Sequence, residues 1–207
     1  MIESLLLVSS VCIDAFVASI AYGTNKIKIP VISALIINII GSFTLGFSLF
    51  FGGFVKNFLP GKLPIYISFL ILIFIGIYRL FEGIFKNYIR KRNYLDKHLT
   101  LKIFDINIIL QIYADEIKAD LDKSKILTAK ESLYLAFALS FDSIAVGFGS
   151  SLVGGGYILA IILCFIIGLA TVILGQFLGR KFSEKSPLNL SWLSGLILII
   201  LAITKLF

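Results

Sequence analysis

The sequence predicts an all-α, polytopic membrane protein with six transmembrane helices arranged as two inverted three-helix repeats. Three observations carry this prediction. The 207 residues are 58% hydrophobic and 15% charged, with a mean hydropathy of +1.01, whereas soluble domains are about 45–50% apolar and about 25% charged. Six apolar stretches are long enough to span a bilayer. An aspartate also recurs in a similar apolar setting in each half of the chain.

A helix needs about 20 apolar residues to cross the hydrocarbon core. The stretches that meet this length are about 3–23, 31–55, 64–85, 131–152, 157–179 and 188–207. The first has no basic residues before it and contains an aspartate, so we expect a retained membrane helix rather than a cleaved signal peptide. One connection is long and polar and holds ten of the 19 Lys and Arg residues. We therefore divide the chain into a first repeat, 1–85, a long loop, 86–130, and a second repeat, 131–207.

The two repeats are related in sequence. Aligning Asp14 with Asp142 sets an offset of 128 residues. Weaker matches follow in order in the next two helices: Gly41 with Gly168, Gly52 with Gly179, and Arg79 with Lys205. Because each repeat has three spans, the second copy must enter the membrane from the opposite side. Inverted repeats of this kind place their binding site near the midplane, between the copies.

Basic residues predict the orientation, because cytoplasmic loops carry an excess of Lys and Arg. With the N-terminus outside, the cytoplasmic side receives Lys26, Lys28, the basic residues of 86–130 and three more between 180 and 185. The sequence therefore predicts a multi-pass protein of the bacterial cytoplasmic membrane, with both termini outside and the long loop inside. The net charge of +7 comes from these loops. The chain contains no basic domain with base-stacking aromatic residues, so the sequence does not indicate nucleic-acid binding.

Asp14 and Asp142 are the first candidates for a functional site. An ionised carboxylate at the bilayer centre costs roughly 2.5–3.5 kcal/mol even on lenient scales, so a chain that carries two in matching settings is expected to use both. Each lies on a helix face of small residues. If the two helices meet along these faces, the carboxylates converge on a site for a divalent cation, since Mg²⁺, Ca²⁺ and Mn²⁺ prefer oxygen ligands. The alternative is a pair of protonated or hydrogen-bonded aspartates that only joins helices.

Other polar residues in the apolar stretches are secondary candidates. Asn38 and Gln176 could add side-chain carbonyl oxygens to a metal site, although hydrogen bonding between helices is the alternative. Arg79 and Glu82 lie three residues apart on one helix. We expect them to pair with each other or to reach the membrane interface.

The long loop contains a segment that matches most of the twelve-residue EF-hand pattern. Its candidate ligands stand at positions one, three, five, seven, nine and twelve of the pattern: Asp120, Asp122, Ser124, Ile126, Thr128 and Glu131. Lys125 replaces the glycine that normally makes the sharp bend. We expect either a site for Ca²⁺ or Mn²⁺ or an ordinary solvated stretch that leads into the next helix.

Signals for catalysis are scarce, and we expect no enzyme. The single histidine, His98, lies in a basic polar stretch and is expected to be solvated. The chain has no Gly-rich phosphate-binding loop of the Walker type. Transport would therefore depend on an ion gradient rather than on ATP hydrolysis within this chain.

The segments around the two aspartates resemble a known family. Asp14 to Ser19 and Leu139 to Gly147 are similar to motifs of the MntP manganese efflux pumps, which belong to the LysE group of exporters. Residues 119–124 resemble more closely the sporulation-associated YtaF branch of that family. Two features depart from the pumps. Cys12 stands where they tend to have serine, and the arginine and glutamate of the third helix are three rather than four residues apart.

The resemblance implies Mn²⁺ export across the cytoplasmic membrane, with Asp14 and Asp142 in the metal path. The expected partners are then a divalent cation and the lipid bilayer, and homo-oligomerisation stays open. Two alternatives remain. One is export of an organic solute such as an amino acid, as in other LysE-group members. The other is a non-transporting sporulation membrane protein whose loop recruits partners.

Overall fold

The computed structural model describes residues 2–92, 109, 112–113, 116–154, 157–181 and 191–206, with side chains over 3–81, 109, 112–113, 117–154, 157–181 and 196–205. Six long helices dominate this part of the chain: α1 (Ile2–Thr24), α2 (Val31–Lys56), α3 (Leu63–Arg92), α5 (Ala129–Ser151), α6 (Tyr157–Lys181) and α7 (Ser191–Leu206). A short 3₁₀ helix, η1 (Glu116–Ala119), precedes α5. Among the described residues there is no strand beyond an isolated bridge between Lys28 and Ile126, so the all-α prediction is confirmed.

Five of the six helices are long and apolar enough to cross a membrane: α1, α2, α3, α5 and α6. Their bounds lie close to the predicted spans, except that α3 continues to Arg92 instead of ending near residue 85. The chain is therefore a multi-pass membrane protein. α7 is apolar but has 16 residues, fewer than the stretch predicted over 188–207. A sixth crossing stays a prediction.

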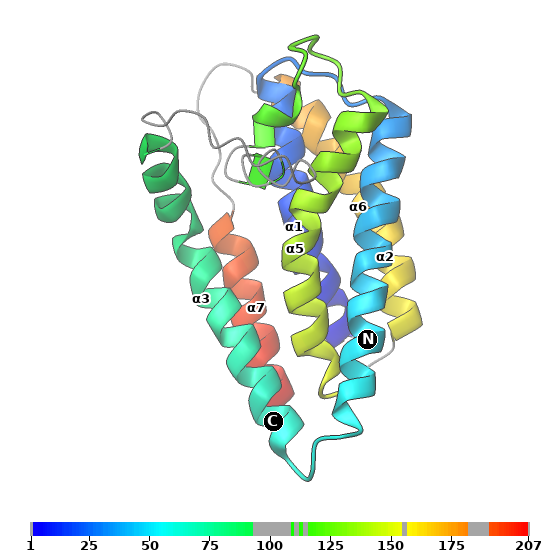
Figure 1. Ribbon diagram of the computed structural model, residues 1–207, viewed down its shortest axis with the longest axis vertical. Helices are drawn as coiled ribbons and strands as arrows, with labels where there is room; N and C mark the ends of the chain where they lie inside the picture. Colours follow the sequence, from blue (N-terminus) through cyan, green and yellow to red (C-terminus); the bar gives the residue numbers. More distant parts are fainter. Residues whose placement is uncertain are drawn as a thin grey trace, which may run out of the picture.

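The helices lie lengthwise beside one another, and both chain ends lie at the same end of the bundle (Figure 1). The opposite end carries the turn between α1 and α2 and the segment that precedes α5 (Figure 1). α1 packs mainly on α6, α5 on α2, and α3 on α7. α1 and α5, which carry the two aspartates, contact each other much less. Direct packing of α1 on α5 along their small-residue faces, on which the predicted site depended, is therefore limited.

Two helix pairs pack at close range in the same way. A β-carbon at Gly179 of α6 would collide with the carbonyl oxygen of Ile20 in α1. A β-carbon at Gly52 of α2 would lie 2.9 Å from the carbonyl oxygen of Phe148 in α5. Ile20 and Phe148 differ by 128 in number, and Gly52 and Gly179 differ by 127. The contact between α1 and α6 thus repeats the contact between α5 and α2.

The next contact along these helices repeats as well. Gly175 of α6 lies against the carbonyl of Phe16, which a β-carbon at Gly175 would approach to 2.8 Å. The residues at the same offsets are Ser48 and Ile144. The Ser48 hydroxyl donates a hydrogen bond to the Ile144 carbonyl. Small residues on α2 and α6 therefore admit the backbones of α5 and α1, as in many membrane helix pairs.

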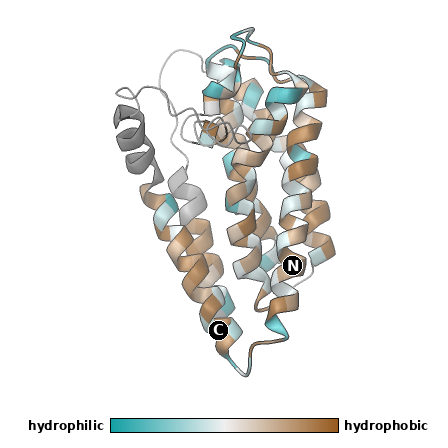
Figure 2. Cartoon of the chain, viewed as in Figure 1, coloured by the Kyte–Doolittle hydropathy of each residue, from teal (hydrophilic) through white to brown (hydrophobic). Residues whose placement is uncertain are grey.

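Hydrophobic residues make up much of the long helices (Figure 2), and many of their large side chains are exposed on the outside of the bundle. The most exposed include Phe43 at 73%, Phe50 at 74%, Phe74 at 75% and Ile158 at 76%. Soluble monomers rarely expose large contiguous apolar patches to water, but a bilayer solvates such side chains without cost. The surface therefore supports the membrane assignment independently of helix length.

The segment that precedes α5 is fastened to the turn between α1 and α2. The Lys28 N–H donates to the Lys125 carbonyl at 2.8 Å, and the Leu127 N–H donates to the Lys28 carbonyl at 2.9 Å. The Ser33 hydroxyl donates to the Leu127 carbonyl at 2.7 Å. Two segments that the sequence placed on the same side of the membrane therefore lie together at one end of the bundle.

Gly179→Ala is expected to destabilise the protein, because the added methyl group would collide with the backbone of α1 rather than with a flexible side chain. Overpacking of this kind typically costs about 1–3 kcal/mol. Thermal unfolding of the purified protein in detergent, followed by circular dichroism, would measure the loss.

Gly41→Ala is the matched control, because a β-carbon at Gly41 in the middle of α2 meets nothing within 4 Å. Alanine favours a helix over glycine, so the unfolding midpoint should stay the same or rise slightly. Equal midpoints for Gly41→Ala and Gly179→Ala would contradict the close packing of α1 on α6.

Candidate functional site

Asp14 and Asp142 are joined through one arginine. Nη1 of Arg79 in α3 donates to Oδ1 of Asp14 in α1. Nη2 of the same guanidinium lies 3.1 Å from Oδ2 of Asp142 in α5. Three helices that are far apart in sequence therefore each contribute one charged group to the same place. The two aspartates do come together, as the sequence analysis anticipated, but through a shared positive charge.

Arg79 is almost completely buried, with 1% of its side chain exposed, and the two aspartates are 15% and 18% exposed. Taking a charge out of water costs several kcal/mol unless partners compensate it, and the two carboxylates compensate Arg79. Arg79 does not reach the membrane interface, because its side chain is buried and binds the two aspartates. The side chain of Glu82 lies outside the described residues, so the expected pairing of Arg79 with Glu82 stays a prediction.

Sequence reasoning missed Arg79 as a member of this site, although a signal was available. Ionisable residues inside membranes generally pair with one another and face the interior of the bundle. A chain with two embedded aspartates and one embedded arginine therefore invites that pairing.

The long loop returns to the site through Tyr113. Its hydroxyl donates to Oδ1 of Asp142 at 3.4 Å, and its ring lies edge-on to Phe141 with 6.4 Å between the ring centroids. The neighbouring Ile112 is fully buried. Part of the loop thus packs inside the bundle and contacts the aspartate pair from the end that carries η1.

A small cavity lies beside Asp14 and is lined by α1, α2, α5 and α6. Its polar lining includes Asp14, Asn38, Ser42, Ser140 and Ser143. Nδ2 of Asn38 donates to the carbonyl of Phe165 in α6 at 2.6 Å. Oxygen-bearing side chains therefore line part of the space next to Asp14, and Asn38 stays a secondary candidate.

Gln176 lies away from the aspartates. Its Nε2 donates to the carbonyl of Ile27, in the turn between α1 and α2, at 3.3 Å. It does not line the cavity beside Asp14. The alternative expected for Gln176, a hydrogen bond between elements, fits this geometry. His98 lies outside the described residues.

The EF-hand-like segment does make the sharp bend. Lys125 has a φ of +60°, in the left-handed region that usually favours glycine. Carboxylate oxygens of Asp120, Asp122 and Glu131 lie within 4.8 Å of one another. Burial raises the pKa of the Asp120 carboxyl, whereas hydrogen bonds from the Ser124 hydroxyl and N–H lower the pKa of Asp122. The three acids predicted at positions one, three and twelve are therefore close together.

The remaining predicted ligands already bond within the segment. The Ser124 hydroxyl donates to the Ile126 carbonyl at 3.0 Å, and the Thr128 hydroxyl donates to Glu131 Oε2 at 2.7 Å. Glu131 also accepts the Thr128 N–H at 2.9 Å and the Leu121 N–H at 2.7 Å. Thr128 and Glu131 form a capping box at the start of α5, a signature that the sequence analysis did not use. A metal would have to replace these hydrogen bonds, and metal binding here stays a prediction.

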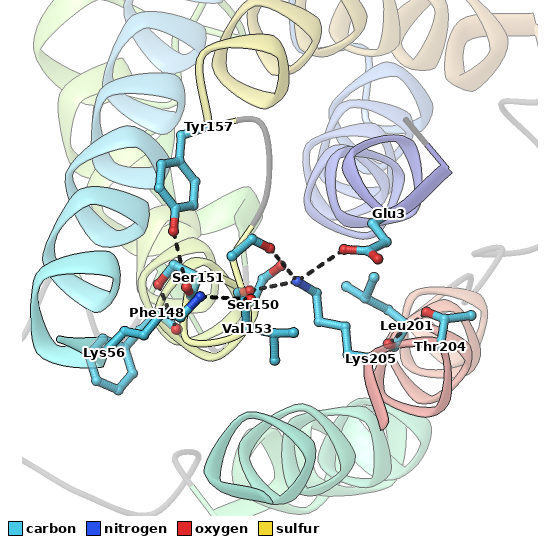
Figure 3. Close-up of polar contacts among 11 residues, drawn as sticks. Glu3, Lys56, Phe148, Ser150, Ser151, Val153, Tyr157, Leu201, Thr204 and Lys205 are labelled. Atoms are coloured by element: carbon cyan, nitrogen blue, oxygen red, sulfur yellow. Dashed lines mark hydrogen bonds and ion pairs between the residues drawn. The ribbon is translucent and has the colours of Figure 1, made fainter. Parts of the chain in front are cut away.

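A second buried cation lies at the end of the bundle that carries the chain termini (Figure 3). Nζ of Lys205 in α7 donates to the carbonyls of Ser150 at 2.7 Å and Gly154 at 3.2 Å, and it lies 3.3 Å from Oε2 of Glu3. The last carbonyls of a helix have no partner within that helix. Lys205 therefore caps α5 and ties it to the first turn of α1.

The same helix end receives a second lysine. Lys56 at the end of α2 donates to the carbonyl of Val153 at 2.9 Å (Figure 3). The sequence aligned Lys205 with Arg79, yet the two cations have different surroundings, since Lys205 binds mainly backbone carbonyls and Arg79 binds two carboxylates. The internal repeat therefore does not extend to the function of these two residues.

Glu131→Ala is expected to loosen the start of α5 and the segment before it, because Glu131 accepts backbone N–H groups from both. Loss of a capping interaction typically costs about 1 kcal/mol. Hydrogen–deuterium exchange of a peptide covering 120–131 should become faster. Lys130→Ala, at an exposed neighbouring position, should leave this exchange unchanged. Equal protection in the two variants would show that Glu131 does not hold the segment.

Comparison with known proteins places the chain in a family. The family model described as "Putative manganese efflux pump" matches residues 84–206, more than half of the chain, in a range that includes Asp142. The "Probable sporulation protein YtaF" of Bacillus subtilis (strain 168) is 30% identical over 209 residues, which cover 100% of this chain and 99% of that protein. No solved structure matches the chain. The chain belongs to the family whose members are described as manganese efflux pumps, and the resemblance to its sporulation-associated branch is confirmed.

Proposed function

We propose that this protein exports a divalent cation, with Mn²⁺ as the first candidate, through a site formed by Asp14 and Asp142. The single observation that carries the proposal is the meeting of two membrane-embedded carboxylates, from two distant helices, on one buried guanidinium. Membership in the manganese efflux family agrees with it. The hard oxygen ligands of the two carboxylates suit Mn²⁺, Mg²⁺ and Ca²⁺.

The ratio of charges favours a transport site over a structural one. One arginine and one aspartate would neutralise each other, and such a pair would be enough to join two helices. Here two carboxylates share one guanidinium, so Arg79 alone neutralises each of them only in part. A partly neutralised carboxylate is costly in a low-dielectric setting. A site that must attract a cation has a reason to keep one.

The repeated helix contacts support an architecture of two inverted halves. α1 with α6 and α5 with α2 meet through residues at the same offsets, 128 and 127. Transporters built from inverted repeats bind their substrate near the midplane and alternate access by rocking one unit against the other. We place the boundaries of the two halves at 1–85 and 131–207, with the polar loop between them.

The two ends of the bundle are held by different contacts. At the end with the termini, Lys205 ties α5 to α1 and α7. At the opposite end, Tyr113 packs over Asp142. In a rocking cycle these contacts would open in turn, first to admit the cation from one side and then to release it to the other.

The placement of basic side chains supports an orientation with both termini outside. The described lysines and arginines near the end with η1 are Lys26, Lys28, Lys118, Lys123, Lys125, Lys130, Arg180 and Lys181. The end with the termini carries Lys56, Lys62 and Lys205. Under the positive-inside rule the first group faces the cytoplasm, and the transport direction is then from that end toward the termini.

A role without transport is the rival proposal, because the full-length relative is named as a sporulation protein. Export of an organic solute, such as an amino acid whose ammonium group pairs with the aspartates, is the other. Purified protein in liposomes separates the three. Movement of Mn²⁺ supports the proposal, movement of amino acids supports the second rival, and no movement of either supports a non-transporting protein.

Asp14→Asn and Asp142→Asn are each expected to reduce Mn²⁺ efflux strongly. Replacing one carboxylate removes a charged ligand, and even substitutions outside the ligands of metal sites cost about 10–100-fold in affinity. Mn²⁺ flux across proteoliposomes, and Mn²⁺ tolerance of cells that depend on the protein, would measure the effect.

Asp122→Asn is the control, since it removes a fully exposed carboxylate from the EF-hand-like segment. It should leave the Mn²⁺ flux close to that of the parent protein. Normal Mn²⁺ flux in both Asp14→Asn and Asp142→Asn would refute the proposed site.

A further inference from the structure

We propose that Arg79 is a built-in substitute for the transported cation, which occupies the aspartate pair when no metal is bound and leaves it when metal binds. The inference rests on the proposed function and deepens it, because it states how the site behaves in the unloaded half of the cycle. Arg79 is thus assigned as a positioning residue that acts through the two carboxylates.

The geometry of the guanidinium is the first argument. Its two terminal nitrogens divide between two acids, Nη1 to Asp14 and Nη2 to Asp142. One planar group thereby holds carboxylates from α1 and α5 at once, as a divalent ion between them would do. Arg79 itself stands on a third helix, α3, which packs mainly against α7. The bridging charge can therefore leave through a change in the Arg79 side chain, without either aspartate moving with it.

Mutual exclusion is the second argument. Oδ1 of Asp14 and Oδ2 of Asp142 both face the guanidinium. A divalent ion bound by the same oxygens would lie only a few ångströms from the arginine, inside a bundle where like charges repel strongly. Metal and Arg79 therefore compete for the aspartate pair, and binding of one expels the other.

Charge balance gives the exchange a purpose. Arg79 supplies one positive charge to the two aspartates when no metal is bound, and a divalent ion supplies two. Without Arg79, the two carboxylates would lack that charge while the unloaded site returns across the membrane, which makes this state more costly. Arg79 therefore lets the empty transporter return across the membrane. Removal of Arg79 should impair net export more than it impairs metal binding.

Arg79→Gln separates these steps. Purified protein in liposomes is assayed for exchange of ⁵⁴Mn²⁺ against equal Mn²⁺ on both sides, for net Mn²⁺ flux into metal-free vesicles, and for Mn²⁺ affinity in detergent. The parent protein should perform exchange and net flux. Arg79→Gln should keep exchange, lose most net flux, and bind Mn²⁺ at least about tenfold more tightly because a competing positive charge is gone.

Two further variants complete the test. Arg180→Gln removes an exposed arginine at the end of α6 and should match the parent in all three assays. Arg79→Lys keeps the charge but not the two-armed geometry, so it should keep exchange and restore part of the net flux. It also serves as the decisive variant if Arg79→Gln does not fold.

The outcomes are distinct. Net flux of parental size in Arg79→Gln would overturn this inference while leaving the proposed function intact. Loss of exchange together with net flux in a folded Arg79→Gln or Arg79→Lys protein would also overturn it, since Arg79 would then support the site itself. If the parent protein moves no Mn²⁺ in either assay, the proposed function fails and this inference fails with it.

Discussion

The pairing of two carboxylates with one guanidinium inside the bundle is the interaction on which the rest of the structure depends. Arg79 can be buried because Asp14 and Asp142 compensate it, and the aspartates can lie among apolar helices because Arg79 compensates them in part. The three groups come from α1, α3 and α5, so the pairing also fixes how these helices sit together. α1 and α5 make little direct contact, and the shared arginine links them where packing does not.

The helices around this centre pack closely, and the contact between α1 and α6 matches the contact between α5 and α2. Gly179 admits the backbone of α1, and Gly52 admits the backbone of α5, at equivalent positions. Each aspartate-bearing helix is therefore held rigidly by one glycine-containing partner, α6 or α2. The two pairs also meet directly through α2 and α6, where Asn38 donates to the Phe165 carbonyl.

Much of this could be predicted from the sequence. Helix positions followed from the lengths of the apolar stretches, and the recurring aspartates at offset 128 identified the residues that meet. The pairing of Arg79 with Asp14 and Asp142 was missed, although two embedded aspartates and one embedded arginine invite it. Which face of α3 turns inward is decided by tertiary packing and could not be predicted. The left-handed backbone conformation of Lys125 could not be predicted either. It accompanies a hydrogen bond from the Lys28 N–H to the Lys125 carbonyl, and Lys28 lies almost a hundred positions earlier. Tyr113 reaches Asp142 only because the long loop folds back into the bundle.

The most direct test of the central claim is a crystal structure of the protein soaked in Mn²⁺, with the ion located by anomalous scattering. The account expects an anomalous peak between the carboxylates of Asp14 and Asp142, with the guanidinium of Arg79 displaced from both. An ion bound only in the 120–131 segment, with Arg79 still bridging the two aspartates, would contradict it.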